Sequence, residues 1–161
     1  PSPNLRGPTA ALLYPGVGLW EATNLSVGRG TDRPFEQLGA PWLDADRFAL
    51  LLNEQGLPGV RFLPVRFTPL SSVYAGQECR GVQILVTDRT RLRPVRMGME
   101  LAAALLRLHP REFETEKLGR LLDNADTLRR LLAGETPAQI EASWKKGLDA
   151  FRKRRAPFLL Y

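Results

Sequence analysis

The chain has 161 residues, of which 43% are hydrophobic and 25% charged, with 23 Lys plus Arg against 17 Asp plus Glu. This composition is that of one ordinary globular domain: it excludes a disordered, collagen-like or coiled-coil chain, and no apolar run approaches the roughly 20 residues of a membrane span. The chain has one Cys, which excludes an internal disulfide, and one His, so a zinc site is improbable. The net charge of +6 indicates affinity for anions.

The first predicted strand covers residues 9–21, with a break at Pro15-Gly16. Residues 21–43 follow with several Gly and Pro and with no clear hydrophobic period. A stretch of this length without its own secondary structure is uncommon in a compact domain and is often a functional loop. It is therefore the first place to look for a site.

A short helix and two strands are predicted next. Asp44 is a suitable N-cap for a helix that ends near Gly56. Residues 60–67 have a strand-like pattern, but Pro64 removes a hydrogen-bond donor and indicates an edge strand or a break. Residues 81–87 place apolar side chains on both faces, which is typical of a central, buried strand.

The second half of the chain is predicted to be helical. Pro94 opens a helix that Pro110 stops, and residues 118–122 and 128–132 form two short helical pieces. The run Thr136-Pro137-Ala138-Gln139 has the spacing of a capping box and starts a long helix. We expect this helix to bury an apolar stripe made of Ile140, Trp144, Leu148 and Phe151. We expect the apolar tail, residues 157–161, to pack back as an extended segment.

Together these elements predict an α/β fold of mixed (α+β) type. It is a single domain in which helices pack a small mixed sheet and the C-terminal half is rich in helix.

His109 and Cys79 are residue types that often carry catalysis, but their settings favour structural roles. His109 lies at a predicted helix C-terminus, where the helix dipole stabilises a basic side chain, and the chain has no G-x-S-x-G motif. Cys79 lies beside Arg80, which would lower a thiol pKa. It also directly precedes the predicted central strand, where a free Cys behaves as a small apolar residue.

The predicted loop from Glu21 to Glu36 is the strongest candidate for a binding site. It gathers hydroxyls, an amide, guanidiniums and carboxylates around Gly28 and Gly30, which allow a ligand to approach the backbone. Either arginine would hold a carboxylate or phosphate through a bidentate fork, and the amide and hydroxyls would bind sugar hydroxyls or an acetamido group. The candidate substrate-binding residues are Glu21, Asn24, Ser26, Arg29, Thr31 and Arg33.

Other interpretations of this loop stay open. Its polar groups could satisfy one another without a ligand, although polar loops on rigid scaffolds often carry sites. Glu21, Asp32 and Glu36 could supply the acid and base of a glycosidase, but that mechanism needs a definite separation that spacing cannot establish. We therefore assign no catalytic residue, and we expect neither a metal nor a cofactor.

The long C-terminal helix is strongly basic, and its cations are Lys145, Lys146, Arg152, Lys153, Arg154 and Arg155. This pattern is typical of a solvated face opposite an apolar stripe. The alternative is a non-catalytic module that binds an anionic polymer, either cell-wall glycan or nucleic acid. Because aromatic residues are not interleaved with the basic ones, nucleic acid is not an expected partner of the favoured function.

The run from Leu12 to Trp42, LLYPGVGLWEATNLSVGRGTDRPFEQLGAPW, resembles the C-terminal region of the exo-lytic β-N-acetylmuramidases of the NamZ type, formerly a domain of unknown function. The similarity covers nearly the whole chain, and its most specific element is the loop with Asn24, Ser26 and the sequence Gly28-Arg29-Gly30-Thr31. Trp20 and Ala22 depart from the family pattern, which has a small or aliphatic residue and a Gly there. The further segments that match are Phe67-Thr68-Pro69, Tyr74-Ala75-Gly76, Cys79 to Val82, Val86 to Arg89, Trp144, Phe151 and Phe158 to Tyr161.

The resemblance implies a larger enzyme than this chain. Family members release terminal N-acetylmuramic acid from the non-reducing end of peptidoglycan fragments, in a cleft between a Rossmann-like N-terminal domain and a smaller C-terminal domain. The proposed catalytic glutamates lie in the N-terminal domain, so residues 1–161 correspond to the C-terminal domain alone and are expected to be inactive by themselves. The chain begins at Pro1 without a signal-peptide pattern, which we interpret as a processed or excised form.

The resemblance also implies partners and a location. The expected partners are the N-terminal domain of the same protein and muramic-acid-containing peptidoglycan fragments, and the expected location is the cell envelope or the outside of the cell. Muramic acid carries a lactyl carboxylate, which is a suitable ligand for Arg29 or Arg33. The sequence does not distinguish between the two arginines.

Overall fold

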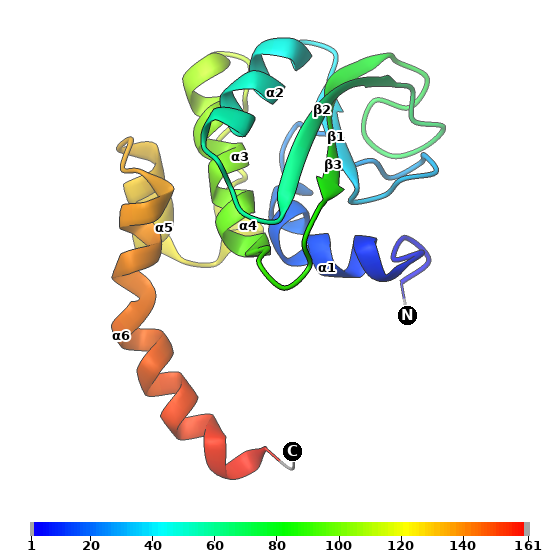
Figure 1. The fold of residues 1–161 in the computed structure, drawn as a ribbon. Coiled ribbons are helices and arrows are strands. Elements are labelled where there is room, and N and C mark those ends of the chain that lie inside the picture. The colour runs from blue at the N-terminus through cyan, green and yellow to red at the C-terminus, as the bar shows by residue number, and fades with distance from the viewer. Residues whose placement is uncertain (1, 160–161) are drawn as a thin grey trace.

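The computed structural model describes residues 2–159 of the chain (Figure 1). Its elements are α1 (Pro8–Val17), the 3-10 helix η1 (Gly18–Trp20), β1 (Gln37–Ala40), α2 (Ala45–Glu54), β2 (Val60–Phe67), β3 (Cys79–Val86), α3 (Pro94–Leu108), α4 (Gly119–Leu122), α5 (Ala125–Leu132), α6 (Pro137–Arg155) and the 3-10 helix η2 (Ala156–Phe158). The predicted fold class is confirmed: one small sheet is packed by helices, and the C-terminal half is helical. Within residues 2–159, none of the helices combines the length and the hydropathy of a membrane span.

The sheet has the strand order β1-β3-β2, and both pairs are antiparallel. β3 is the central strand, as its two apolar faces predict. β2 is an edge strand, which is where a sheet tolerates Pro64. β1 joins the sheet where Gly39 faces Gly81, and a Cβ on either glycine would collide with the backbone of the opposite strand. The two glycines therefore bring β1, and the loop before it, close to β3.

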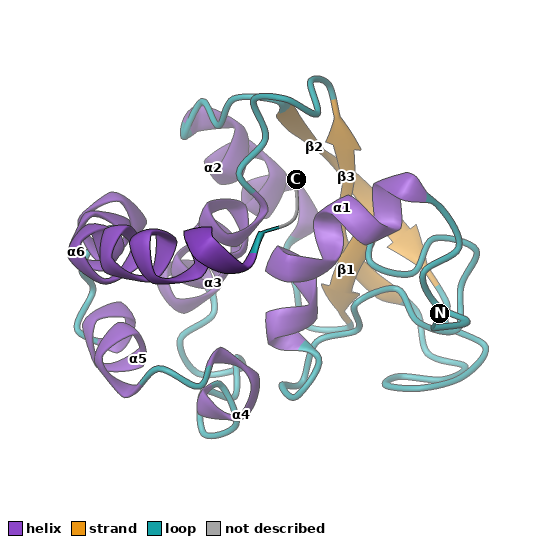
Figure 2. Cartoon of the chain, turned by 90° about the horizontal axis from the view of Figure 1, so that it is seen from below, coloured by secondary structure: helices purple, strands orange, loops and turns teal. Residues whose placement is uncertain are grey.

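Helix α2 packs against β2 and β3, and α3 packs against α2 and crosses α1 (Figure 2). The predicted N-cap of α2 is confirmed, since Asp44 Oδ1 accepts a hydrogen bond from the Arg47 N–H at 3.1 Å. α3 begins at Pro94 as predicted, and Met97, Leu101 and Leu105 are buried on it.

The predicted strand over residues 9–21 is wrong, because this segment forms α1 and η1. The buried residues of α1 are Ala10, Leu13, Gly16 and Val17, which have helical spacing. Gly16 is part of a close helix crossing: a Cβ there would collide with the Pro94 carbonyl, and a Cβ on Gly98 would lie 2.5 Å from the Gly16 carbonyl oxygen. Pro15-Gly16 therefore marks a helix contact and not a break in a strand.

The expectation of no secondary structure over residues 21–43 is also wrong, because β1 lies within this stretch. Ser26 adds a further antiparallel bridge to Gly39, with both backbone N–H···O distances at 2.9 Å. β1 has only four residues, one of them Gly, so its strand conformation comes from pairing with β3 and not from local preference.

The capping box at the start of α6 is confirmed. The Thr136 N–H donates to Gln139 Oε1 at 2.9 Å, and the Gln139 N–H donates to Thr136 Oγ1 at 3.3 Å. The expected burial of the whole apolar stripe is not found. Ile140 is fully buried and Trp144 half-buried, whereas Leu148 and Phe151 are 44% and 47% exposed. The reason is length: α6 extends beyond the body of the domain, so its second half has no neighbouring element to cover it (Figure 1).

The expectation that the tail packs back is contradicted as far as Leu159. Residues Ala156–Phe158 form η2, which continues outward from α6, and Phe158 and Leu159 are exposed. Residues 160 and 161 lie outside the described part of the chain. A short apolar tail buries surface only if the preceding helix returns it to the core, and α6 leads away from the core.

Candidate functional site

The loop between η1 and β1 is firmly attached to the core. Val27 and Phe35 are buried, and the Phe35 N–H donates to the Val27 carbonyl at 2.8 Å. The Glu36 carbonyl accepts the Ile84 N–H of the central strand at 2.8 Å. These contacts hold the base of the loop against the sheet. The tip of the loop therefore projects from a rigid support.

The two loop glycines make room for the protein's own backbone. Gly28 has φ +78°, and a Cβ there would meet the Arg33 carbonyl, so this glycine closes a tight turn within the loop. Gly30 has φ +81°, and its carbonyl accepts the Leu70 N–H at 2.8 Å. A Cβ on Gly30 would collide with the backbone of Ser71. The space that the sequence suggested for a ligand is therefore occupied by the segment around residues 70 and 71.

Two of the candidate residues, Ser26 and Thr31, make their hydrogen bonds within the loop and to β1. Ser26 is 2% exposed, its backbone pairs with β1, and its hydroxyl accepts the Gly28 N–H at 3.4 Å. The Thr31 hydroxyl donates to the Gly28 carbonyl at 2.6 Å and accepts from the Arg33 N–H at 3.1 Å and from Gln37 Nε2 at 3.0 Å. Both hydroxyls are thus engaged in holding the turn.

Asn24 links the loop to the segment after α3. Its Nδ2 donates to the Glu112 carbonyl at 2.8 Å, and its Oδ1 accepts the Glu114 N–H at 3.0 Å. Its own carbonyl accepts the Tyr74 hydroxyl at 3.0 Å, and that hydroxyl accepts from Trp42 Nε1 at 3.2 Å. Burial of the ring raises the pKa of Tyr74 above its usual value, so the hydroxyl stays a donor in this chain of hydrogen bonds.

The charged candidates are the groups that remain accessible. Arg29 Nη1 donates to Glu21 Oε1 at 2.8 Å, with the arginine side chain 46% exposed and the glutamate side chain 18% exposed. Arg33 is exposed and forms no ion pair with any residue in the described range 2–159. The structure therefore brings Glu21 and Arg29 together and leaves Arg33 as a separate cation on the same loop.

The loop carboxylates differ in their surroundings. Glu21 is occupied by Arg29, and the Asp32 side chain is fully exposed, 3.9 Å from Arg6. Glu36 is half-buried, and its carbonyl is bound to the sheet. Neither Glu21 nor Asp32 is set in an apolar pocket of the kind that a glycosidase acid occupies.

The structural roles assigned to His109 and Cys79 fit the geometry. His109 is the C-cap residue of α3, its Nε2 accepts the Asp44 N–H at 3.2 Å, and its ring lies 5.3 Å from that of Trp42. Cys79 is fully buried, and this burial raises the pKa of its thiol to about 11. Because the thiolate is the nucleophilic form, Cys79 is inert near neutral pH.

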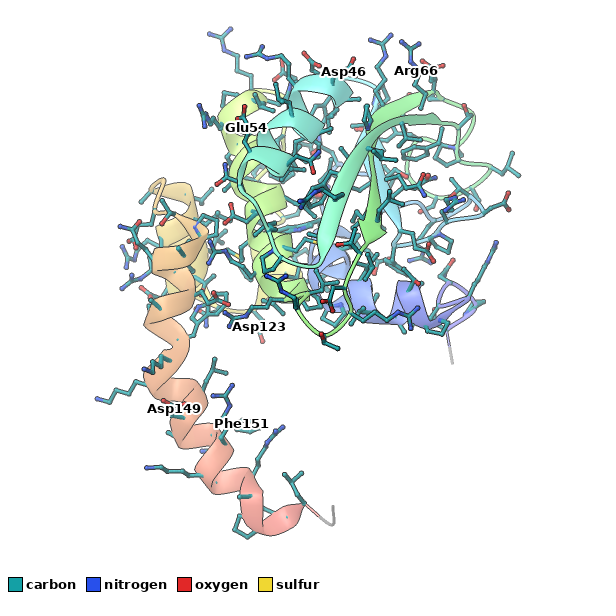
Figure 3. The ribbon with its side chains drawn as sticks, in the orientation of Figure 1. Asp46, Glu54, Arg66, Asp123, Asp149 and Phe151 are labelled. Carbon is teal, nitrogen blue, oxygen red and sulfur yellow. The ribbon has the colours of Figure 1, made fainter. Side chains whose placement is uncertain are left out.

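Sequence reasoning missed a polar groove beside the start of α2. Trp42, Asp44, Asp46, Arg66 and Arg80 are among the residues that line it. Figure 3 shows Asp46 and Arg66 at the same end of the molecule. The hydrogen bond from Trp42 to Tyr74 connects this groove to Asn24 in the loop. The groove residues come from three separate segments, so no local sequence motif identifies them. Trp20, which departs from the family pattern, is fully buried.

The comparisons with known proteins agree on one family. The family model of the C-terminal domain of exo-β-N-acetylmuramidase NamZ matches residues 12–161. The peptidoglycan β-N-acetylmuramidase NamZ of Bacillus subtilis is 37% identical over 164 residues, which cover 100% of this chain and 40% of the relative. The chain thus spans about two fifths of the length of that relative.

Two crystal structures of DUF1343 family proteins from Bacteroides fragilis have the same fold. One has a TM-score of 0.73 at 27% identity, and the match covers 99% of this chain and 44% of that protein's chain. The other has a TM-score of 0.66 at 26% identity and covers 100% of this chain and 43% of its own. On the family match and the identity to the Bacillus subtilis relative, this chain belongs to the family of NamZ C-terminal domains.

Proposed function

We propose that this chain forms one wall of the substrate cleft of a peptidoglycan β-N-acetylmuramidase and binds the terminal N-acetylmuramic acid there. Membership of the NamZ C-terminal family and the name of the Bacillus subtilis relative support the reaction class. The catalytic carboxyls would come from a preceding domain. Peptidoglycan is an envelope polymer, so the proposed place of action is the cell envelope or the outside of the cell.

The observation that carries the proposal is the Glu21–Arg29 pair on a rigid loop. Glu21 closes η1 and Arg29 lies between the two glycine turns, so both side chains start from well-held backbone. The 2.8 Å contact engages Nη1 of Arg29 and leaves its other N–H donors for a ligand. A guanidinium that is already oriented binds a carboxylate at less entropic cost than a freely rotating one.

The ion pair with Glu21 therefore favours Arg29 over Arg33 as the partner of the lactyl carboxylate. Arg33 has the unpaired charge, but in the described structure nothing orients its side chain, so binding a ligand would require it to be ordered. Asn24, Ser26 and Thr31 hold the loop in place: Asn24 is hydrogen-bonded to residues 112 and 114, and the two hydroxyls are hydrogen-bonded to Gly28 in the turn.

The test is hydrolysis of a chromogenic N-acetylmuramide by the protein that contains both this chain and its preceding domain. Arg29→Ala should weaken hydrolysis of the muramide far more than hydrolysis of the analogue that lacks the lactyl carboxylate. The expected difference in transition-state stabilisation is about 1.5–3 kcal/mol, the value of a charge-assisted hydrogen bond.

Arg33→Ala is the matched control, because it removes the same charge from the same loop. If it alone discriminates between the two substrates, the assignment passes from Arg29 to Arg33. If neither variant discriminates, the loop does not bind the carboxylate.

This chain by itself should release no product above background, since a glycosidase needs two carboxyls at a set separation. Turnover by the isolated chain would show that the catalytic carboxyls do not come from a preceding domain, and would make Glu21, Asp32 and Glu36 catalytic candidates.

A further inference from the structure

The contacts that hold α6 to the domain come from its first two turns. Ile140 is buried, and Glu141 accepts from Arg93 at 2.8 Å and from Arg96 at 3.1 Å. Trp144 Nε1 donates to the buried Thr127 hydroxyl at 2.9 Å. These contacts fix the direction of the helix, so the part that follows is presented in a defined orientation. We call residues 147–159 the α6 arm.

The α6 arm continues the apolar stripe that begins in the core. Leu148 and Phe151 follow Trp144 at intervals of four and three residues, so they lie on the same side of the helix as the buried Ile140. Together with Phe158 and Leu159 they are between 44% and 79% exposed. In Figure 3, Phe151 lies on the side of α6 that faces the space below the domain, whereas Asp149 lies on the other side. A stripe of large apolar side chains that runs on beyond its own core is typical of a protein interface.

The cations around this stripe indicate the charge of its partner. Arg154 and Arg155 place their guanidinium carbons 5.7 and 5.8 Å from the centre of the Phe151 ring. Lys145 and Arg152 each follow a stripe residue by one position, so they flank the stripe, and both are exposed. An apolar strip edged by cations matches an apolar patch edged by carboxylates. A bare polyanion such as a glycan chain or a nucleic acid would use the cations but would leave Leu148 and Phe151 in water.

The relatives indicate what covers the arm. This chain corresponds to the C-terminal 40% of the Bacillus subtilis relative and to 44% of one solved relative, so most of each relative lies outside the matched region. In Figure 1, α1 lies along the lower side of the domain, and the α6 arm projects below that same side. A domain attached ahead of α1 would therefore begin on the side where the arm projects.

We propose that the α6 arm is the contact surface for the preceding domain, and that Leu148 and Phe151 insert into an acid-edged apolar patch on it. This inference rests on the two-domain part of the proposed function, but it does not depend on muramic-acid binding or on Arg29. The arm would set the position of the preceding domain and thereby the width of the cleft.

The experiment measures how fast a thiol reagent labels Leu148→Cys, both in this chain alone and in the protein expressed from its complete reading frame. Cys79 gives no background, because it is fully buried and its thiol pKa is about 11. In the isolated chain the new thiol should react as fast as an exposed one. In the longer protein it should react at least about tenfold more slowly, because buried sites react only through opening.

Ala150→Cys is the matched control, since residue 150 is exposed and lies on nearly the opposite side of the helix. Its labelling rate should be the same in both proteins. Adding Phe151→Asp to the longer protein should restore fast labelling of Leu148→Cys, because it places a charge in the apolar contact.

Fast labelling of Leu148→Cys in both proteins would overturn the proposal. So would slow labelling in the isolated chain together with a dimer in light scattering, which would make the partner a second copy. A reading frame that encodes no preceding domain would also overturn it. If labelling behaves as expected but Arg29→Ala and Arg33→Ala do not discriminate between substrates, the interface stands and the substrate-binding role fails.

Discussion

At the scale of single residues, the polar groups of the loop divide by whether the protein already binds them. Asn24 and Thr31 each make hydrogen bonds to backbone atoms, whereas Arg29 keeps free donors and Arg33 has no ion-pair partner within residues 2–159. Replacing Asn24 would remove the hydrogen bonds that tie the loop to residues 112 and 114, as well as any hydrogen bond to a ligand. Loss of activity in an Asn24 variant would therefore report loop position, and the arginines are the sharper probes of binding.

Trp144→Ala should cost the isolated chain about 2–4 kcal/mol of unfolding free energy, because it removes a half-buried aromatic ring and leaves the Thr127 hydroxyl without its donor. Leu148→Ala, on the same stripe one turn later, should cost less than about 0.5 kcal/mol because that side chain is exposed. Urea unfolding of the two variants measures the difference. Equal losses would show that α6 is covered along its whole length in this chain.

At the scale of elements, the crossing of α1 and α3 depends on two glycines in contact. Gly98→Ala should destabilise the isolated chain by about 1–3 kcal/mol, because the new Cβ would lie 2.5 Å from the Gly16 carbonyl oxygen and force the helices apart. Thermal unfolding followed by circular dichroism measures this change.

Gly147→Ala is the control for helix propensity. No atom lies within 4 Å of a Cβ built at Gly147, which is an exposed position in α6. The same substitution should therefore stabilise the chain there, by up to about 1 kcal/mol. If Gly98→Ala also stabilised the chain, the two helices would not be in close contact at Gly16.

At the scale of the whole molecule, a single core joins the sheet and the helices. It runs from Leu13 on α1 through Ile84 on β3 and Leu101 on α3 to Ile140 on α6. We expect the isolated chain to unfold in one cooperative transition, with coincident near-UV and far-UV circular dichroism curves. A broad transition with binding of an apolar dye would show instead that folding needs another domain.

The elements that the sequence determined by itself are those with strong local signals. The caps at Asp44 and Thr136, the helix start at Pro94, the edge strand with Pro64 and the central strand β3 all follow from short patterns, because each depends on hydrogen bonds or side-chain periodicity within a few residues. The polar loop could likewise be recognised as a candidate site from its composition.

The tertiary structure decided what depends on distant partners. β1 is a strand only because Gly39 and Gly81 allow it to pair with β3, and α1 is placed by Gly16 against Gly98. Likewise, Arg29 meets Glu21, and Gly30 meets the backbone of Ser71, only after the loop has folded onto the sheet. The exposure of Phe151 depends on where the domain ends along α6, which no periodicity encodes. Local patterns record which side chains share a face, but the energy of each contact depends on what the rest of the chain brings to that face.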